Sequence, residues 1–247
     1  MCAILGNVYE CPELLPLTEK RPLATLPFDC KYRLIDFDLS NAINANIKSV
    51  YMIFNQGTTK SVFDHIGGGR EWHLDSVDSR HFIHFYQDFL KKKTEGRPYF
   101  ESIIDYLNKS KSEYTVFMGN RMLCNIDLEA VLKSHQQSDS TITVVYKKMP
   151  KEQIYRQDEI LEVDEQGIVQ GHHNFLEDKS EDALFNLGMK IFICSTEWLI
   201  NALQEGQNLG SPVALLDFLN LAMGKVKTSA YEYTGFLRNI FDIKSYY

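Results

Sequence analysis

The sequence predicts an α/β protein whose sheet is mostly parallel and flanked by helices. Short apolar runs typical of strands recur at residues 2–6, 48–54, 113–119 and 141–148. Between them, apolar residues return every three or four positions, the spacing of a helix with one buried face. Four alternations of strand and helix over the first 150 residues indicate parallel strands joined by crossover helices.

The helices of the first half have local start and stop signals. Residues 31–47 carry a helical apolar stripe, and Asp38 or Ser40 is expected to cap its start. The glycines at 67–69 are expected to end the next helix, since glycine readily adopts a left-handed terminal turn. Asp127 opens a further helix, where a carboxylate is favourable beside the helix dipole.

Two parts of the sequence are less regular. Residues 70–98 are polar and rich in histidine, and we expect a loop with a short strand at its centre. The part after residue 150 is the other. A turn at residues 165–167 predicts a hairpin, and Thr196 is expected to cap a helix. With a last helix at 211–224 and a last strand at 226–233, residues 1–247 are interpreted as one domain.

Composition excludes several classes of partner. The formal charge of −7 argues against nucleic acid, whose phosphates require a basic face. No apolar run approaches the roughly 20 residues of a membrane span, so no membrane partner is expected. We see no secretion leader and no paired cysteine spacing in the five cysteines, which favours reduced, mostly buried thiols and a cytoplasmic location.

The turn after the first strand is a poor phosphate loop. A phosphate-binding turn uses glycines to bring backbone N–H groups close to the ligand. Here the turn "GNVYECPEL" has one glycine, Gly6, followed by bulky, acidic and proline residues. The favoured interpretation is a surface loop, with phosphate binding as the alternative. The run Gly67–Arg70 lacks the Lys-Ser/Thr of a P-loop and is interpreted as a helix end.

A histidine-rich stretch provides candidate metal ligands. His81 and His84 have the spacing of one helix face, with His73 nearby and Asp75 and Asp78 as candidate carboxylate ligands. The segment lacks an evident rigid scaffold, so a solvated loop is the favoured interpretation. His172 and His173 are interpreted in the same way.

One long motif resembles a known enzyme family. The run "LPFDCKYRLIDFDLSN", residues 26–41, with the preceding "PLTEKRP", is similar to the N-terminal region of glucose-1-phosphate adenylyltransferases. The stretches "SVFDHI", "GREW", "NIDL", "ITVVYKK" and "YEYTG" resemble the GlgD-type regulatory-subunit branch of that family. The resemblance implies a dinucleotide-binding-like (Rossmann-like) nucleotidyltransferase domain, with a left-handed β-helix following it in the full-length protein.

The same resemblance implies that the catalytic site is degenerate. The family holds Mg²⁺ with an aspartate after the strand matching residues 113–119, where this chain has Gly119 and Asn120. A second metal-holding aspartate falls at Val213, a lysine falls at Leu23, and a further aspartate falls at Asn239. The lysine that binds the sugar phosphate falls near His172 and His173. Each lost metal ligand or phosphate-neutralising cation should cost on the order of several kcal/mol of transition-state stabilisation.

Some polar and glycine positions of the family remain, and the resemblance makes them candidates for residual ligand binding. They are Arg21, Arg33, Asp36, Gln56, Gly119, Asn186 and Gly188. Asp127 is a further carboxylate that a weak enzyme could recruit.

Three functions are consistent with a family scaffold and a degenerate site. The first is a regulatory, catalytically deficient subunit that forms a hetero-oligomer with a catalytic glucose-1-phosphate adenylyltransferase subunit. The second is a weakly active enzyme in its own right, and the third is a module that binds a nucleotide or sugar phosphate. We expect no cofactor or metal in this chain, and Mg²⁺ only in the active partner subunit.

Overall fold

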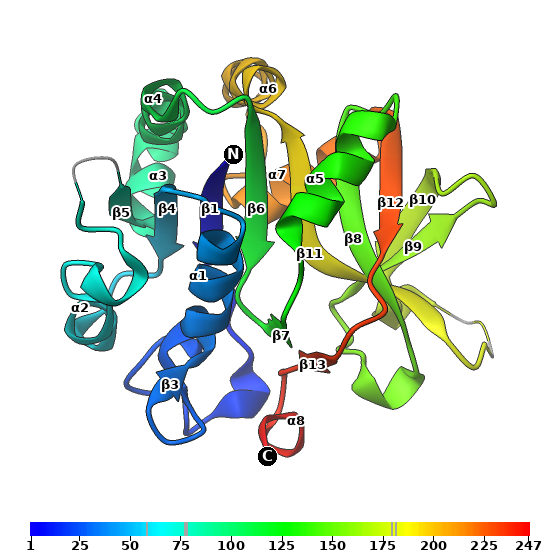
Figure 1. Ribbon diagram of the computed structural model, residues 1–247, viewed down its shortest axis with the longest axis horizontal. Helices are drawn as coiled ribbons and strands as arrows, with labels where there is room; N and C mark the ends of the chain where they lie inside the picture. Colours follow the sequence, from blue (N-terminus) through cyan, green and yellow to red (C-terminus); the bar gives the residue numbers. More distant parts are fainter. Residues whose placement is uncertain (58, 77–78, 179, 181) are drawn as a thin grey trace.

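The structure, a computed structural model, describes residues 1–57, 59–76, 79–178, 180 and 182–247 (Figure 1). The predicted fold class is confirmed: a mostly parallel sheet is flanked by helices. The strands of the large sheet are β1 (Cys2–Asn7), β4 (Ser49–Phe54), β5 (Arg80–Phe85), β6 (Tyr114–Gly119), β8 (Ile142–Met149), β9 (Glu159–Val163), β10 (Val169–Asn174), β11 (Phe185–Ser195) and β12 (Thr228–Glu232).

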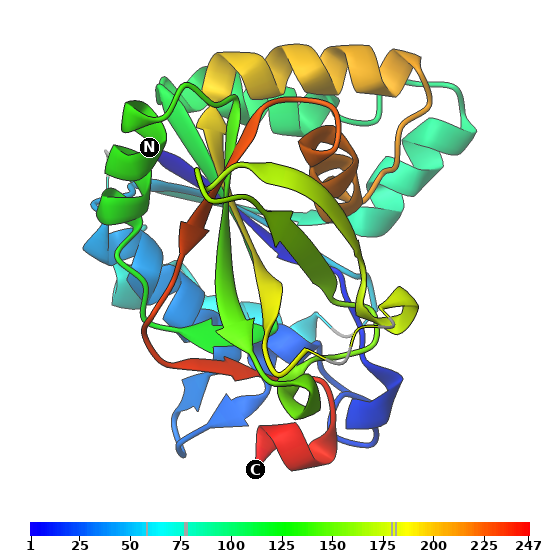
Figure 2. The same cartoon turned by 90° about the vertical axis from the view of Figure 1, so that its right-hand side faces the viewer.

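The sheet has a parallel half and a mixed half. β1 lies between β4 and β6, and β5 adds to the far side of β4, all in parallel. β11 is antiparallel to β6 and to β8, and β12 pairs with β8 in parallel. The first part of β11 also contacts the antiparallel hairpin of β9 and β10, which faces the viewer in Figure 2.

Eight α-helices are described, and most of them cover the two faces of the sheet. They are α1 (Leu34–Asn44), α2 (Lys60–Ile66), α3 (Tyr86–Thr94), α4 (Glu101–Ser110), α5 (Leu128–Gln137), α6 (Thr196–Asn208), α7 (Leu215–Met223) and α8 (Ile243–Tyr246). Short 3₁₀ helices are η1 (Pro12–Leu14), η2 (Leu23–Thr25), η3 (Arg70–Trp72), η4 (Lys151–Gln153) and η5 (Phe175–Glu177).

Two apolar cores follow from the alternation of side chains along each strand. In β1, Ala3 and Leu5 face the core shared with α1, α2 and α5. Cys2 and Ile4 face the opposite core, which α3, α4, α6 and α7 complete. Figures 1 and 2 agree that α1 and α5 lie on one side of the sheet and α6 and α7 on the other.

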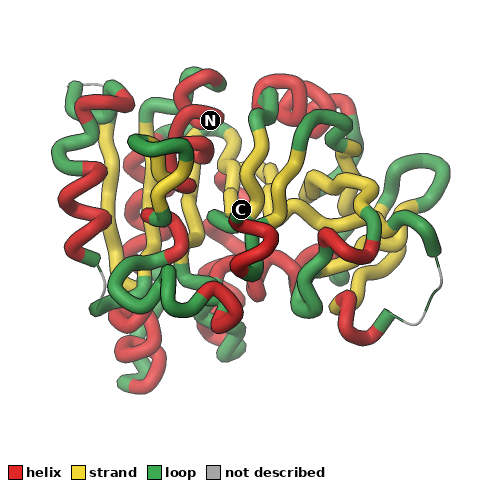
Figure 3. The backbone as a smooth tube through the Cα atoms, turned by 90° about the horizontal axis from the view of Figure 1, so that it is seen from below, coloured by secondary structure: helices red, strands yellow, loops and turns green. Residues whose placement is uncertain are grey.

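The carboxyl ends of β1 and β6 meet a third apolar cluster at one edge of the sheet. The small sheets β2 (Pro27–Phe28) with β3 (Tyr32–Arg33), and β7 (Met122–Cys124) with β13 (Leu237–Asn239), lie at this edge. Leu14, Leu23 and Ile240 are buried together there. α8, at the C-terminal end of the chain, lies against this edge (Figure 3). The Tyr246 hydroxyl donates a hydrogen bond to the Pro27 carbonyl. In an open α/β sheet this is the edge that normally holds a ligand.

Two local predictions were wrong at the level of single residues. α1 begins at Leu34, where the Asp36 carboxylate accepts a hydrogen bond from the Arg33 backbone N–H at 2.8 Å, so neither Asp38 nor Ser40 is its cap. Ser195, not Thr196, caps α6, because its hydroxyl accepts from the Trp198 N–H. Asp127 does cap α5, accepting from the N–H groups of residues 129 and 130.

The histidine-rich segment contains more regular structure than predicted. β5 is the expected short strand, but the helix α3 follows it directly. Only Phe89 of α3 is buried, so its apolar stripe is too thin to be seen in the sequence. Within the described part of the chain, every helix is too short or too polar to cross a membrane.

Candidate functional site

Two asparagines mark the sheet edge where a ligand is expected. β1 and β6 pair in parallel with Gly6 opposite Gly119, so Asn7 and Asn120 follow at neighbouring strand ends. Both asparagines are buried. The Nδ2 atom of Asn120 has no hydrogen-bond partner among the residues that the structure describes. The strand therefore delivers an amide to this edge, as the sequence predicted.

The residue after Asn120 is a buried arginine. Arg121 is 3% exposed, and its guanidinium forms a very short ion pair with the carboxylate of Asp158. The guanidinium also lies over the ring of Tyr155, 4.8 Å from the centroid, in a cation–π contact. Its second terminal nitrogen lies 3.5 Å from the Cys11 sulfur. Arg121 is thus fixed on three sides.

Asp158 is the centre of a closed charge network. It is fully buried and accepts from Arg121, from the Lys190 ammonium at 3.1 Å and from Asn239 Nδ2 at 2.7 Å. The Tyr155 backbone N–H donates at 3.0 Å to Oδ2 of Asp158, the same oxygen that accepts from Asn239. We call Arg121, Asp158, Lys190 and Asn239 the Asp158 network. A carboxylate accepts about four hydrogen bonds, so Asp158 has no free lone pair for another ligand.

Lys190 reaches the network from a distorted position in β11. Its φ of 59° is left-handed, and the pairing of β11 with β8 is irregular between Gly188 and Phe192. Burial lowers the pKa of the Lys190 ammonium, and the neighbouring Arg121 lowers it further. The Cβ atom of Lys190 would lie 3.0 Å from a Cβ added at Gly119, so Gly119 is needed for close packing here.

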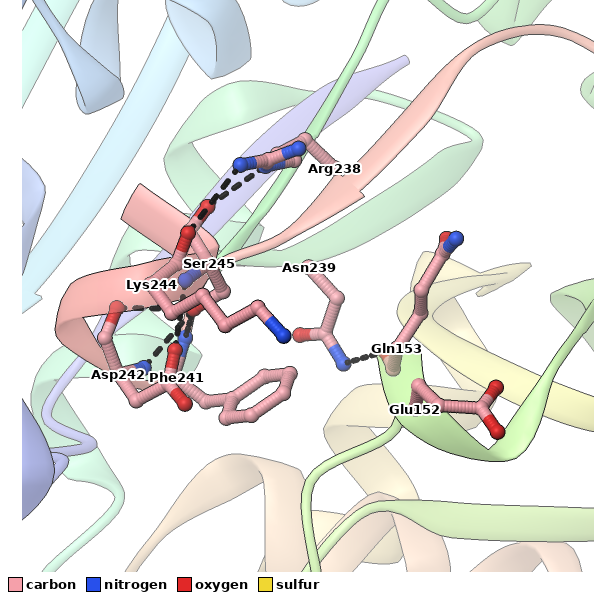
Figure 4. Close-up of a pocket in the computed structure, with 8 residues that line it drawn as sticks. All are labelled: Glu152, Gln153, Arg238, Asn239, Phe241, Asp242, Lys244 and Ser245. Carbon is pink, nitrogen blue, oxygen red and sulfur yellow. Dashed lines mark hydrogen bonds between the residues drawn. The ribbon is translucent and has the colours of Figure 1, made fainter. Parts of the chain in front are cut away.

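Asn239 connects the network to a surface cleft. Figure 4 shows it between the residues of α8 and those of η4, and its Nδ2 also donates to the Gln153 carbonyl at 3.0 Å. The cleft has a volume of about 270 Å³. Arg238 beside it donates to the Ser245 and Lys244 carbonyls at the end of α8. The residue at the family's aspartate position therefore serves a structural contact in this chain.

The loop after β1 closes over the strand ends instead of opening to a ligand. The Tyr9 hydroxyl donates a very short hydrogen bond to Asp217, and the Tyr9 ring lies 5.5 Å from the Lys190 ammonium. Burial is the main cause of the raised pKa of Tyr9. Asn55 holds the same loop by donating to the Val8 carbonyl at 2.8 Å.

The space beneath this loop is filled by apolar side chains. The cavity bounded by Gly6, Tyr9, Phe117 and Val213 has a volume of about 10 Å³. That is about the volume that a single water needs, so this cavity has no room for a nucleotide. Val213, at the family's aspartate position, contributes its side chain to this apolar wall.

The residues at this edge do not fit Mg²⁺. The ion prefers octahedral oxygen ligands, usually with one or two carboxylates. Asp158 is saturated by donors, and the Arg121 and Lys190 cations would face an incoming cation. Within the described part of the chain, no group of three or more His, Cys, Asp and Glu side chains is arranged to hold a metal.

Leu23 is also used for packing. It begins η2 and is 3% exposed in the apolar cluster at the sheet edge. The family resemblance places a lysine at this position, and in the structure Leu23 is a core residue.

The candidates for residual ligand binding do not gather in one site. Arg21 lines a cleft with Glu10 and Glu19, two carboxylates that disfavour phosphate. Arg33 and Asp36 are joined at the start of α1. Only Gly119 lies beside the Asp158 network.

The remaining three candidates are engaged elsewhere. Gln56 is exposed, and its backbone N–H donates to the Gln87 side chain at 2.7 Å. Asn186 donates to the Leu161 carbonyl at 3.1 Å, and Gly188 packs against the Glu159 backbone in the sheet.

The histidines of the candidate metal site lie on a strand. His81 and His84 belong to β5, so residues three apart point to opposite faces and cannot share a helix face. His84 stacks on Tyr51 at 4.5 Å, and burial lowers its pKa. Asp78 lies outside the described residues.

His172 and His173 contact carboxylates rather than lying free in solvent. His172 Nδ1 lies 2.9 Å from Glu159, and His173 Nε2 lies 2.9 Å from Asp178. The hydrogen bond to Glu159 is the main cause of the raised pKa of His172, which burial opposes. Glu159 follows Asp158 directly, so this pair borders the network.

This pair predicts a pH-dependent contribution to stability. The pKa of His172 is higher in the folded state than in the unfolded state. Its stabilising contribution is therefore complete below the unfolded-state pKa of about 6.5 and is lost as pH rises through the folded-state pKa. The difference in unfolding free energy between the wild type and His172→Gln should therefore be larger at about pH 6 than at about pH 9. Urea titrations at both values test it, and an equal difference at both would contradict it.

No pattern in the sequence singles out Arg121, Asp158 and Lys190 as site residues. Arginine, lysine and aspartate are usually exposed, so such residues are assigned to the surface. The one available signal was the arginine directly after Asn120, because a charged side chain at a buried strand end needs a partner of opposite charge.

Comparison with known sequences decides the family. The sequence profile described as Nucleotidyl transferase matches residues 12–170 of the chain. The chain belongs to the nucleotidyl transferase family. The resemblance inferred from the motifs is confirmed by individual relatives.

Two relatives are called glycogen biosynthesis protein GlgD. The protein from Bacillus subtilis strain 168 is 33% identical over 205 residues, covering 80% of this chain and 57% of the relative. The protein from Geobacillus stearothermophilus is 34% identical over 148 residues, covering 59% and 43%. Glucose-1-phosphate adenylyltransferase 1 of Vibrio vulnificus strain YJ016 is 28% identical over 181 residues, covering 69% and 43%. The chain thus spans about half the length of these relatives.

The fold of this nucleotidyl transferase family member recurs in a solved structure. A crystal structure described as a glucose-1-phosphate thymidylyltransferase from Bacillus anthracis superposes with a TM-score of 0.72. The match covers 99% of this chain and 92% of that one at 10% sequence identity, so it supports the fold alone.

Proposed function

We propose that the protein is a catalytically deficient regulatory subunit of a glucose-1-phosphate adenylyltransferase. In this role it supports the synthesis of ADP-glucose from ATP and glucose 1-phosphate for glycogen biosynthesis, in the cytoplasm. The observation that carries the proposal is the Asp158 network, which places the chain's own charges at the edge where the family holds its substrates.

The charges explain why chemistry is disfavoured. Adenylyl transfer brings anionic phosphates together and requires a divalent cation with carboxylate ligands. This chain offers the amides Asn120 and Asn239 and a saturated aspartate. Mg²⁺ is accordingly assigned to the catalytic partner subunit, and this chain takes no cofactor.

Regulation requires a coupling between subunits. An effector response changes when two subunits share an interface whose free energy differs between the active and inactive states. A subunit with a filled site contributes to this coupling through its scaffold alone, which accounts for retention of the family fold with a degenerate site.

A reconstitution experiment tests the regulatory role. ADP-glucose formation by a catalytically active homologue is measured over a range of activator concentrations, alone and with an equimolar amount of the intact protein. We expect a shift in the activator concentration for half-maximal rate by about threefold or more, since coupling energies are typically about 1–3 kcal/mol. An equal amount of an unrelated protein is the control. Superimposable activation curves, with no hetero-oligomer on size exclusion, would contradict the proposal.

A further inference from the structure

A second cleft lies away from the Asp158 network, on the outer side of α1. It has a volume of about 490 Å³ and is bounded by the β2–β3 hairpin, α1, the end of α2 and η3. This volume falls in the range of about 300–1,000 Å³ that is usual for ligand pockets. The proposed regulatory function does not use the cleft.

The cleft brings together two motif stretches that the degenerate site does not explain. Tyr32, Asp36 and Ser40 come from "KYRLIDFDLSN", and His65 and Glu71 come from "SVFDHI" and "GREW". These are stretches through which the chain resembles the GlgD-type branch. Their residues line one surface although they are separated in the sequence.

One wall of the cleft is a polar row along α1. Asp36, Ser40 and Asn44 are four residues apart, so they follow one another on one helix face at about 6 Å along the axis. Ser40 and Asn44 are exposed. The row offers a carboxylate, a hydroxyl and an amide, which together can accept and donate hydrogen bonds.

The carboxylate of this row is held in place. One oxygen of Asp36 lies 2.6 Å from His65 Nε2, and the other accepts from the Arg33 backbone N–H at 2.8 Å. His65 packs edge-on against Trp72, with centroids 5.5 Å apart. Fixed polar groups lose little conformational entropy when they bind a ligand.

The hairpin adds an aromatic surface. The Tyr32 side chain is 44% exposed, and the Lys31 ammonium lies 5.1 Å from its ring centroid. An aromatic ring with a polar tip provides a flat apolar surface next to hydrogen-bonding groups. Such a surface suits a ligand that is itself apolar on one face and polar at its edges.

The charges of the cleft disfavour a phosphorylated ligand. Lys31 is the single lysine that lines the cleft, and it faces the carboxylates of Asp36 and Glu71. Phosphate recognition normally uses clustered arginines or lysines. A neutral ligand with many hydroxyl groups can donate hydrogen bonds to both carboxylates and pack an apolar face on the aromatic ring.

We propose that this cleft binds a neutral oligosaccharide. The hydroxyl groups of the sugar donate to Asp36 and Glu71 and exchange hydrogen bonds with Ser40 and Asn44. A sugar ring packs on Tyr32. Binding here is independent of nucleotide, because the cleft and the Asp158 network share no residue.

Calorimetric titration of the intact protein with maltotetraose, in the absence of ATP, tests the proposal. We expect a dissociation constant of about 1 mM or tighter, and at least about a tenfold loss of affinity in Tyr32→Ala and in Glu71→Gln. Both side chains are exposed, so both variants should keep the fold.

Matched variants outside the cleft provide the control. Tyr247→Ala and Glu129→Gln change an exposed tyrosine and an exposed glutamate elsewhere and should bind like the wild type. Glucose 1-phosphate, used as a competitor, should not displace the saccharide more than glucose does. The proposal is wrong if maltotetraose gives no binding heat at about 10 mM, ten times the expected dissociation constant, or if Tyr32→Ala binds as the wild type does. Preferential displacement by the phosphorylated sugar would also overturn it, in favour of an anion site.

Discussion

Replacement of Asp158 by alanine should lower the free energy of unfolding by about 3–5 kcal/mol, because it leaves a buried cation without its partner. Asp158 is fully buried and accepts from two cationic side chains and an amide. Without it, the Arg121 guanidinium keeps only the Tyr155 ring and the Cys11 sulfur as neighbours. Neither of these neutralises a charge.

Urea denaturation of Asp158→Ala and of the control Asp139→Ala measures this effect. Asp139 also pairs with a lysine, at 3.2 Å, but its side chain is fully exposed. An exposed pair contributes little, so the control should unfold close to the wild type. Equal midpoints for the two variants would contradict the buried network.

A double-mutant cycle shows whether Arg121 and Asp158 act as a unit. Once Asp158 is alanine, the further change Arg121→Met removes the unpaired charge and should recover part of the lost stability. The coupling energy should be about 0.5–3 kcal/mol. Strict additivity of the two single changes would show that the side chains do not interact in solution.

Gly6→Ala should lower the free energy of unfolding by about 1–3 kcal/mol, through overpacking at the end of β1. A Cβ added at Gly6 would lie 2.5 Å from the Phe117 ring, which itself is buried in the core. The single glycine of "GNVYECPEL" thus makes room for an aromatic side chain.

Gly68→Ala is the matched control for this change. Nothing lies within 4 Å of a Cβ added at Gly68, and its φ is not in the left-handed range. Thermal unfolding of both variants should show a lower midpoint for Gly6→Ala only. A midpoint for Gly6→Ala at the wild-type temperature would mean that Phe117 moves without cost.

The sequence was sufficient for the fold because its hydrophobic periodicity is strong. β1, β4 and β6 are continuous apolar runs buried on both faces, and such runs can be recognised locally. The place of Asp127 at the start of α5 was also recognisable locally, because its carboxylate accepts from N–H groups only two and three residues away. Asp38 and Ser40 were wrongly expected as caps because α1 begins at Leu34, where the Asp36 carboxylate already accepts from the Arg33 N–H.

The contents of the site were predictable only in part. The motif comparison located the amides Asn120 and Asn239, but no local pattern relates Arg121 to Asp158, which is 37 residues away. Their contact depends on how the turn after β6 meets the segment directly before β9. The histidines of β5 were misread because a spacing of three has different meanings on a helix and on a strand.

The central claim is that the chain's own charges occupy the inherited catalytic edge and prevent turnover. The most direct measurement is pyrophosphate release by the intact protein alone, at high concentration, with ATP, glucose 1-phosphate and Mg²⁺. We expect no release above a buffer control. Sustained turnover at about 1 s⁻¹ or faster, within the ordinary range of enzymes, would contradict the claim.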